Sequence, residues 1–432
     1  MRNFFRKLSP ARIVALGFAF LILLGSVLLS LPCSVKDGVH TTYADMLYTS
    51  TSAVCVTGLV VLDPADTFTP IGQTILGLLM QIGGLGVTVV GAGIILAVGQ
   101  KVDLKGRTVI RESMNLNSSK AAVQFVKRVL LSTLTFEIVG AALSFIVFSQ
   151  DFPLPRAIGI SLFHSVAAFN NSGFDILGGF QSLTAYSDDI LLNLVTAALI
   201  IFGGIGFLLI REVIEKKFRW RKFSMHTKVV LSFSAALIVF GTLLLKLTDN
   251  ISLLEAFFSS VSARTAGFAS VPMGSLSTAG LIVMIVLMFI GASPGSTGGG
   301  VKTTTIFVLL LGIRSSATNR SEKAFKYSVP SDAFRKAAII VLIGIGIVLT
   351  GTFLLLIFDP QIALSDALFE ITSAFGTAGL STGITGSLSF ASKLLCIIIM
   401  YIGRLGPMTI ATLWYFSKGE RIRYPEGNIS IG

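Results

Sequence analysis

Four short segments of the sequence end alike, in a polar or small residue, then glycine, then leucine or phenylalanine. Each is an apolar run rich in small residues, and the four runs are 45–58, 160–173, 254–267 and 366–379. A glycine can take positive φ without a Cβ clash, which lets successive carbonyl groups turn toward one axis. Rings of backbone carbonyls replace the hydration shell of a cation. The four segments therefore predict a cation filter.

Each segment contributes three residues to the predicted filter, and their side chains are mostly small. The residues are Val56, Thr57, Gly58, Asn171, Ser172, Gly173, Thr265, Ala266, Gly267, Thr377, Ala378 and Gly379. No carboxylate stands at any of the four turns, which argues against a calcium-type ring of acidic side chains. A dehydrated potassium ion instead needs oxygens from dipoles, so that it can also leave. The short helices would point their partially negative C-terminal ends at the ion path.

These segments are too short to cross a bilayer, but each lies between apolar runs that are long enough. The chain is 53% hydrophobic and 13% charged. The predicted spans are 12–31, 70–98, 122–149, 188–211, 227–248, 278–312, 334–358 and 391–416. The sequence thus predicts an all-α membrane protein with four tandem helix–pore loop–helix repeats, eight transmembrane helices around one pseudo-fourfold pore. The repeats are expected at 1–100, 101–215, 216–320 and 321–432.

The net charge of +12 is unevenly placed along the chain. Lys and Arg gather in the N-terminal arm, the loops at 100–128, 211–228 and 314–336, and the C-terminal tail. This is the positive-inside pattern, which places both termini in the cytoplasm and argues against a nucleic-acid partner. The opposite loops are poor in Lys and Arg and hold most of the aspartates. Those carboxylates either concentrate cations at a pore mouth or form an ordinary solvated surface.

The second helix of each repeat carries glycines about 25 to 30 residues after the filter glycine. These groups begin at Gly83, Gly203, Gly291 and Gly403. One such group in a membrane helix is usually a packing feature, because small residues let helices approach. Four copies at similar positions indicate a fourfold internal repeat. We expect them to allow close packing and bending of the inner helices.

The third of these helices is interrupted at 291–300, GASPGSTGGG. Five glycines and a proline cannot propagate a regular helix. Backbone left unpaired there must face water or protein. The string differs from a phosphate-binding loop, because Val301 separates Gly300 from Lys302 and a membrane span precedes it. A simple packing kink is the alternative interpretation.

Arg404 lies within the last predicted span, where a charge costs roughly 3 kcal/mol or more to insert. We expect it to face the ion path, where it would repel cations and help to close a gate, or to form an ion pair or a clamp on carbonyl groups. Lys302 would either serve a similar role or extend toward the cytoplasm, and we favour the second. Arg264 is expected to brace the third loop through backbone hydrogen bonds, with Glu370 and Asp366 as possible partners.

The four loops, the eight spans and the segment 262–268 (SARTAGF) resemble the Trk/Ktr/HKT superfamily of potassium transporters, and within it KtrB, the membrane subunit of bacterial Ktr systems. The resemblance covers nearly the whole chain. It implies that Gly58, Gly173, Gly267 and Gly379 line a filter that holds potassium ions. Glycine at all four positions goes with potassium selectivity in that family, whereas serine in the first loop marks sodium-permeable relatives.

The resemblance also implies a gate and partners. The gate would be the intramembrane loop below the filter together with Arg404, that is Gly291, Ser293, Pro294, Gly295, Gly298, Gly299, Gly300 and Arg404. The implied assembly is a homodimer in the cell membrane with a cytosolic KtrA-like nucleotide-binding ring as regulator. The basic cytoplasmic loops could dock that ring or bind anionic membrane lipid. No cofactor is expected in this chain.

Two other functions are alternatives to ion conduction. A secondary transporter of another small solute or of sodium would also use a broken helix near the membrane midplane. Four parallel repeats with glycine turns argue against it. An intramembrane enzyme is disfavoured because no HExxH motif, paired aspartates or Ser–His arrangement lies on the spans.

Overall fold

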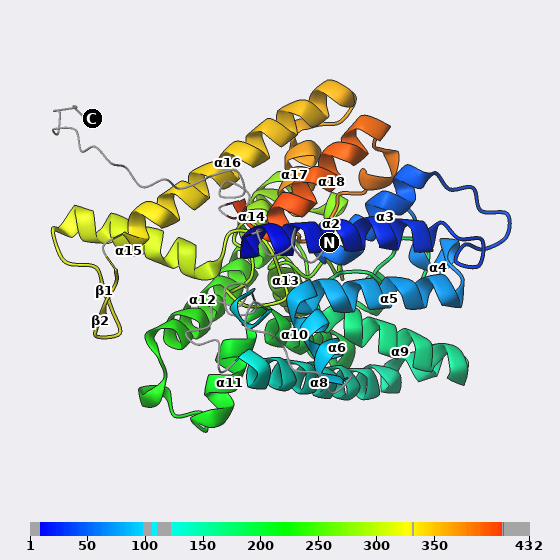
Figure 1. Cartoon of the computed structure of the whole chain (residues 1–432). Coiled ribbons are helices and arrows are strands. Elements are labelled where there is room, and N and C mark those ends of the chain that lie inside the picture. The colour runs from blue at the N-terminus through cyan, green and yellow to red at the C-terminus, as the bar shows by residue number, and fades with distance from the viewer. Residues whose placement is uncertain (1–8, 98–105, 110–121, 331, 408, 410–432) are drawn as a thin grey trace.

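One pattern of helices recurs four times in the computed structural model, which describes residues 9–97, 106–109, 122–330, 332–407 and 409. In each repeat a first helix is followed by a short helix, a glycine corner and a second helix (Figure 1). The predicted helical repeat architecture is therefore confirmed. The only strands in the described residues are β1 (Lys323–Ala324) and β2 (Tyr327–Ser328), an antiparallel hairpin between the third and fourth repeats.

The first helices of the four repeats are α2 (Pro10–Leu29), α8 (Ala122–Asp151), α12 (Met225–Thr248) and α16 (Ala333–Phe358). Each is long and apolar enough to cross a membrane. The short helices are α3 (Tyr43–Cys55), α9 (Leu154–Phe169), α13 (Leu253–Ser262) and α17 (Leu364–Gly376). The second helices are α5 (Pro70–Leu85) with α6 (Val87–Ala97), α10 (Ile190–Gly204) with α11 (Phe207–Glu215), α14 (Thr278–Phe289) with α15 (Thr303–Thr318), and α18 (Phe390–Leu405). A short helix, α4 (Pro64–Thr67), follows the first corner.

Two of the predicted spans, 70–98 and 188–211, are not single helices. The axis turns by 101° between α5 and α6 and by 97° between α10 and α11. The breaks fall at Gly86 (φ 86°) and Gly206 (φ 95°), a backbone conformation that L side chains rarely adopt. The expected bending of the inner helices is thus confirmed for the first and second repeats. With each bent pair taken as one span, the described residues hold up to six spans by length, so the count of eight stays a prediction.

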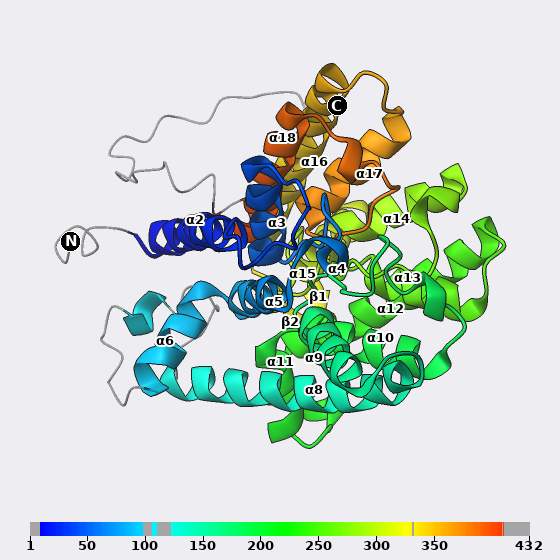
Figure 2. The ribbon, with the colours of Figure 1, turned by 90° about the vertical axis from the view of Figure 1, so that its right-hand side faces the viewer.

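The short helices form the inner layer of the molecule, and the first helices form the outer layer (Figure 2). The second helices close the inner layer into a ring. Helix α5 contacts α3 and α9, α10 contacts α9 and α13, α14 contacts α17, and α18 contacts both α17 and α3. The ring is therefore closed where α18 of the fourth repeat packs against α3 of the first repeat.

A glycine in each first helix marks where that helix meets its short helix and its second helix. The glycines are Gly25, Gly140, Gly241 and Gly351. A Cβ on any of them would overlap side chains from both neighbours, such as Ser165 and Leu199 for Gly140. At the first three sites the facing serine donates its hydroxyl to a carbonyl three residues before the glycine, as Ser165 does to Glu137 O at 2.7 Å. Small residues thus allow the close helix packing that a membrane protein needs.

The aspartates of the loops that are poor in Lys and Arg make structural contacts that neither interpretation of the sequence proposed. Asp249 accepts a hydrogen bond from Ser277 N at 2.6 Å, and Asp359 accepts one from Ser389 N at 3.0 Å. These two carboxylates therefore hold the starts of α14 and α18. Asp63 is 4% exposed and accepts from Phe180 N at 2.6 Å, which joins the loops of the first two repeats.

Replacing Gly351 by valine tests the packing of the outer layer. A Cβ there would lie 2.6 Å from Ile399 and 2.9 Å from Ile371, so Gly351→Val should cost about 1–3 kcal/mol of stability through overpacking. The control is Gly346→Val on the same helix, because no atom lies within 4 Å of a Cβ there. Thermal unfolding in detergent should show a lower Tm for Gly351→Val only. Equal Tm values for the two variants would contradict this packing.

Candidate functional site

The four corners share one backbone conformation. The residue two positions before each glycine is in the left-handed region, although it is not glycine. These residues are Val56 (φ 58°), Asn171 (φ 58°), Thr265 (φ 71°) and Thr377 (φ 51°). The glycines that follow have φ of 92°, 68°, 82° and 81° for Gly58, Gly173, Gly267 and Gly379. The positive φ of the glycines agrees with the prediction. The left-handed conformation of the residues two positions earlier was not predicted, because of the four only Asn171 has a side chain that tolerates this region well.

The four glycines meet in a closed ring. A Cβ added to any of them would lie 3.0 Å or less from the carbonyl oxygen that precedes the glycine of the next repeat. The pairs are Gly58 with Ser172, Gly173 with Ala266, Gly267 with Ala378, and Gly379 with Thr57. The order of the ring follows the order of the repeats, and glycine is required at each corner because no side chain fits.

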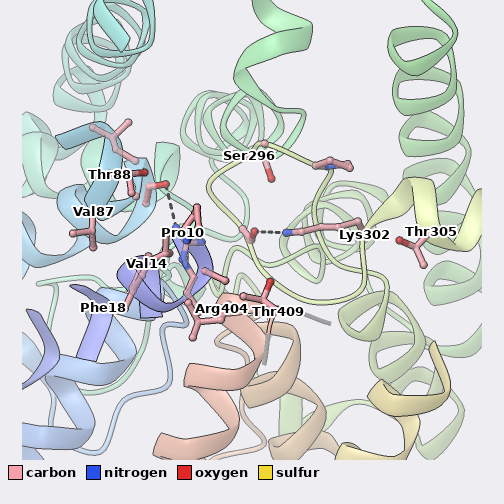
Figure 3. A pocket seen from close by; sticks show the side chains of 18 of the residues that line it. Pro10, Val14, Phe18, Val87, Thr88, Ser296, Lys302, Thr305, Arg404 and Thr409 are labelled. Carbon is pink, nitrogen blue, oxygen red and sulfur yellow. Dashed lines mark hydrogen bonds between the residues drawn. The ribbon is translucent and has the colours of Figure 1, made fainter. Parts of the chain in front are cut away.

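Cavities lie on both sides of this ring. The outer one, of about 370 Å³, is lined by all four corner glycines and by Asp63 and Asp175. The inner one, of about 550 Å³, is lined by the glycines of the α5–α6 break, by residues of the loop between α14 and α15, and by Lys302 and Arg404 (Figure 3). The ring and the loop together separate the two cavities.

The loop between α14 and α15 packs directly against the corners. Gly299 N donates to Thr377 Oγ1 at 3.0 Å, and a Cβ on Gly298 would overlap Thr265 Oγ1. The loop closes on itself where Gly291 N donates to Val301 O at 2.8 Å. Of the predicted gate residues, Gly298, Gly299 and Gly300 therefore lie under the third and fourth corners.

The other part of the loop faces the second repeat. Ser293 N donates to Gly204 O at 3.0 Å, and its hydroxyl pairs with Thr303 Oγ1 at 3.0 Å. A Cβ on Gly206 would lie 2.7 Å from Pro294 O, and Phe207 N donates to Gly295 O at 3.0 Å. Pro294 and Gly295 thus contact the α10–α11 break instead of the corners.

Arg404 binds backbone carbonyls from two repeats. Its guanidinium donates to Thr297 O in the loop and to Gly83 O and Gly84 O at the α5–α6 break, the last at 3.2 Å. Its Cζ also lies 5.7 Å from the centre of the Phe18 ring. Of the expected arrangements, the carbonyl clamp is the one present. Arg404 occupies the position in the fourth repeat that Gly84 occupies in the first repeat. Its hydrogen bonds to Gly83 O and Gly84 O join the fourth repeat to the first across the inner cavity.

Lys302 does not extend toward the cytoplasm as expected. Its Nζ donates to Gly298 O at 2.7 Å and to Gly299 O at 3.3 Å (Figure 3). The flexible side chain turns back because the loop leaves these carbonyls without helical partners. The loop is therefore held by two cations, Arg404 and Lys302, which was the less favoured of the two alternatives for Lys302.

Arg264 is 7% exposed and donates to Ser234 of α12, at 3.0 Å to Oγ and 3.4 Å to the backbone oxygen. It thus braces the third short helix against its first helix. The suggested partners were wrong, since among the described residues neither Glu370 nor Asp366 pairs with it. Glu370 is fully buried and accepts from Ser381 at 2.7 Å and from Thr385 at 2.5 Å.

A buried polar network behind the second corner was not foreseen. Asn170, the last residue before that corner, donates to Gln81 Oε1 at 2.7 Å and to Glu137 Oε1 at 3.1 Å. Gln81 in turn donates to Glu137 Oε2 at 3.2 Å. The sequence signal was Glu137 itself, because a carboxylate inside an apolar span is expensive and needs partners.

Comparisons with known proteins agree with this geometry. A family model described as TrkH, cation transport protein, matches residues 19–248 and 229–419. The chain is 35% identical to the potassium/sodium uptake protein NtpJ of Enterococcus hirae, over 99% of this chain and 98% of that protein. It is also 35% identical to the Ktr system potassium uptake protein B of Bacillus subtilis, over 99% of this chain and 97% of that one.

A solved structure supports the fold. The potassium transporter TrkH from Vibrio parahaemolyticus superposes with a TM-score of 0.73 at 19% identity, covering 94% of this chain and 85% of that one. Both the family model and the full-length relatives match through the repeats that bring the four glycine corners together. The chain is therefore a multi-pass membrane transporter, not an enzyme, and belongs to the TrkH family of cation transport proteins.

Proposed function

We propose that this protein takes up potassium ions across the cell membrane through the ring of corner residues. The closed ring of glycines and carbonyl groups is the observation that carries the proposal. Backbone oxygens at fixed positions can replace the hydration shell of the ion and still release it. The hydroxyl groups of Thr57 and Thr265 are buried without a hydrogen-bond partner in the described residues and could add oxygen ligands. The names of the relatives, which refer to potassium uptake, point the same way.

The gate in this proposal is the loop at 291–300 with Arg404 and Lys302. It lies between the two cavities, under the corners, and both cations bind its carbonyls. A guanidinium about 6 Å from a passing ion would repel it by about 3 kcal/mol at an effective dielectric constant of about 20. An ion could pass only after this loop moved, and its five glycines let the loop change conformation at low cost.

The proposed assembly is a homodimer controlled by a cytosolic nucleotide-binding ring. Relatives named as parts of Ktr systems support the existence of partner components. The termini and the basic loops would face the cytoplasm by the positive-inside rule. The repeat boundaries at residues 100, 215 and 320 are part of the same proposal. No fuel-binding domain is needed, because one charge moving through 100 mV gains about 2.3 kcal/mol.

Flux of potassium, rubidium, sodium and lithium into proteoliposomes tests the filter, with Gly58→Ser as the variant. A Cβ at Gly58 would overlap Ser172 O, so the ring must widen, and sodium flux should rise relative to potassium flux. Gly38→Ser is the matched control, since Gly38 also has positive φ but no atom lies within 4 Å of its Cβ. An unchanged ion preference in Gly58→Ser would refute the filter assignment.

The gate is tested by Arg404→Gln and Lys302→Gln. Each removes charged hydrogen bonds to the loop worth about 1.5–3 kcal/mol apiece, so unregulated potassium flux should rise about tenfold or more. Deleting part of 291–300 should act in the same direction. Arg314→Gln, an exposed cation at the other end of α15, is the control. The gate proposal fails if flux in all three gate variants equals that of the wild type.

Asp175 predicts a pH dependence at the outer cavity. Burial, with the nearby carboxylate of Asp63 as a smaller contribution, raises the pKa of Asp175 to about 6. The group therefore loses its negative charge as the external pH falls from 7 to 5. At about 10 Å and an effective dielectric constant of about 40, one charge changes potassium affinity about fourfold.

The apparent KM for potassium should therefore rise toward low external pH in the wild type. Asp175→Asn should show the higher KM already at pH 7 and little further change. Asp37→Asn, in an outer loop away from this cavity, is the control and should keep the pH dependence of the wild type. A pH-independent KM in the wild type would contradict the prediction.

A further inference from the structure

Helix α11 crosses the end of α8 and leaves a slot between the two helices. The 97° break places α11 nearly at right angles to the span that precedes it, at the end of the molecule away from α4 (Figure 1). The slot has a volume of about 320 Å³. Most of its lining is apolar, and the residues are Phe125, Val129, Leu131 and Ser132 of α8 and Phe207, Ile210 and Ile214 of α11, with Arg128, Arg211 and Glu215.

Two arginines of the slot share a single carboxylate. Arg128 donates to Glu215 Oε1 at 2.5 Å, and Arg211 donates to the same oxygen at 2.9 Å. The three groups carry a net charge of +1, and all three side chains are between 37% and 52% exposed. A guanidinium has five N–H donors, and in the described residues each uses one on Glu215. The remaining donors suit the oxygens of a phosphate group.

The apolar part of the slot is continuous with the surface that faces lipid. Leu131 is 67% exposed and Ile214 is 61% exposed, and both are in contact with the slot. Large apolar side chains exposed on a membrane-spanning helix contact acyl chains. Basic pockets between membrane helices on the cytoplasmic side are suited to anionic head groups. The positive-inside rule puts this end of α8 on the cytoplasmic side.

We propose that the slot binds one phospholipid with an anionic head group. An acyl chain would lie between Val129 and Ile210, and the phosphate would contact Arg128 and Arg211. A zwitterionic lipid would fit less well, because its ammonium group would meet the net positive charge of the arginine pair.

The slot is also linked to the loop between α14 and α15. Phe207, which lines the slot, donates its backbone N–H to Gly295 O at 3.0 Å. On the other face of α11, Glu212 accepts from Ser224 Oγ at 2.7 Å, which ties α11 to the start of α12. A lipid that holds α11 in place would hold the loop in the conformation of this structure. This regulatory part rests on the proposed function, whereas lipid binding does not.

Native mass spectrometry of the full-length protein in detergent tests the binding. Phosphatidylglycerol and phosphatidylcholine with the same acyl chains are titrated in parallel, and tightly bound lipids are counted. We expect one retained phosphatidylglycerol. The double variant Arg128→Gln with Arg211→Gln should bind it about 25-fold more weakly, since each basic side chain near an anionic head group contributes a factor of about five.

Two further variants separate the slot from general surface charge. Arg314→Gln with Arg320→Gln removes two exposed cations from the end of α15 and the turn after it, and should leave the bound lipid in place. Ser132→Phe should fill the slot and weaken binding although both arginines remain. Equal retention of phosphatidylcholine, or an unaffected Arg128/Arg211 double variant, would overturn the site. Complete displacement by glycerol phosphate would overturn it as well, because a small phosphate would then be the ligand.

Potassium flux in vesicles with and without phosphatidylglycerol tests the regulatory part. The wild type should change its flux with the lipid, and the Arg128/Arg211 double variant should not. If the variant loses the lipid but its flux still follows the lipid content, the link to the loop is overturned. If the wild type transports no potassium at all, the proposed function fails while the count of bound lipids still decides the site.

Discussion

The centre of this protein depends on backbone groups that have no helical partner and yet lie deep in a membrane protein. Such groups are tolerated only where protein or water satisfies them. At the four corners the chain turns through a left-handed residue and then a glycine, and each glycine packs against the carbonyl of the next repeat. The ring is therefore one unit: a side chain at any single corner would displace the neighbouring repeat as well. The filter we propose uses the oxygens that this packing leaves on the axis.

The same constraint explains the two cations of the inner cavity. The loop between α14 and α15 exposes carbonyl groups that no helix satisfies, and Lys302 and Arg404 donate to them. Arg404 also donates to the carbonyls of the α5–α6 break. These hydrogen bonds satisfy the carbonyl groups and offset the desolvation cost of burying the two cations. Removing one cation would leave carbonyl groups of the loop without a donor, and the gate that we propose depends on these contacts.

The four repeats differ in how their second helices are interrupted. The breaks in the second helices come from glycine in the first and second repeats. Beyond its break α6 packs against α8 and α2, whereas α11 is tied to the start of α12 through Glu212 and Ser224. The third repeat has the loop between α14 and α15 in place of a simple break, and the fourth has Arg404 in place of a glycine. A symmetric ring can hold an ion on its axis, whereas these unequal breaks connect the ring to particular peripheral elements such as α11.

The sequence by itself determined the repeat, the glycine corners and the break in the third repeat, because these depend on local chemistry that glycine, proline and long apolar runs display directly. The contacts of Arg404 were left open between the ion path, an ion pair and a carbonyl clamp, and in the tertiary structure its guanidinium binds the carbonyls of a clamp. Lys302 was expected to extend toward the cytoplasm because its flexible stem can carry the charge to a polar surface. Its partners are instead carbonyls of a loop whose path the sequence does not specify. The partner of Arg264, the network of Glu137 with Gln81 and Asn170, and the slot between α8 and α11 were likewise decided only by folding. Each joins residues that are distant along the chain, and helix packing alone determines which of them meet.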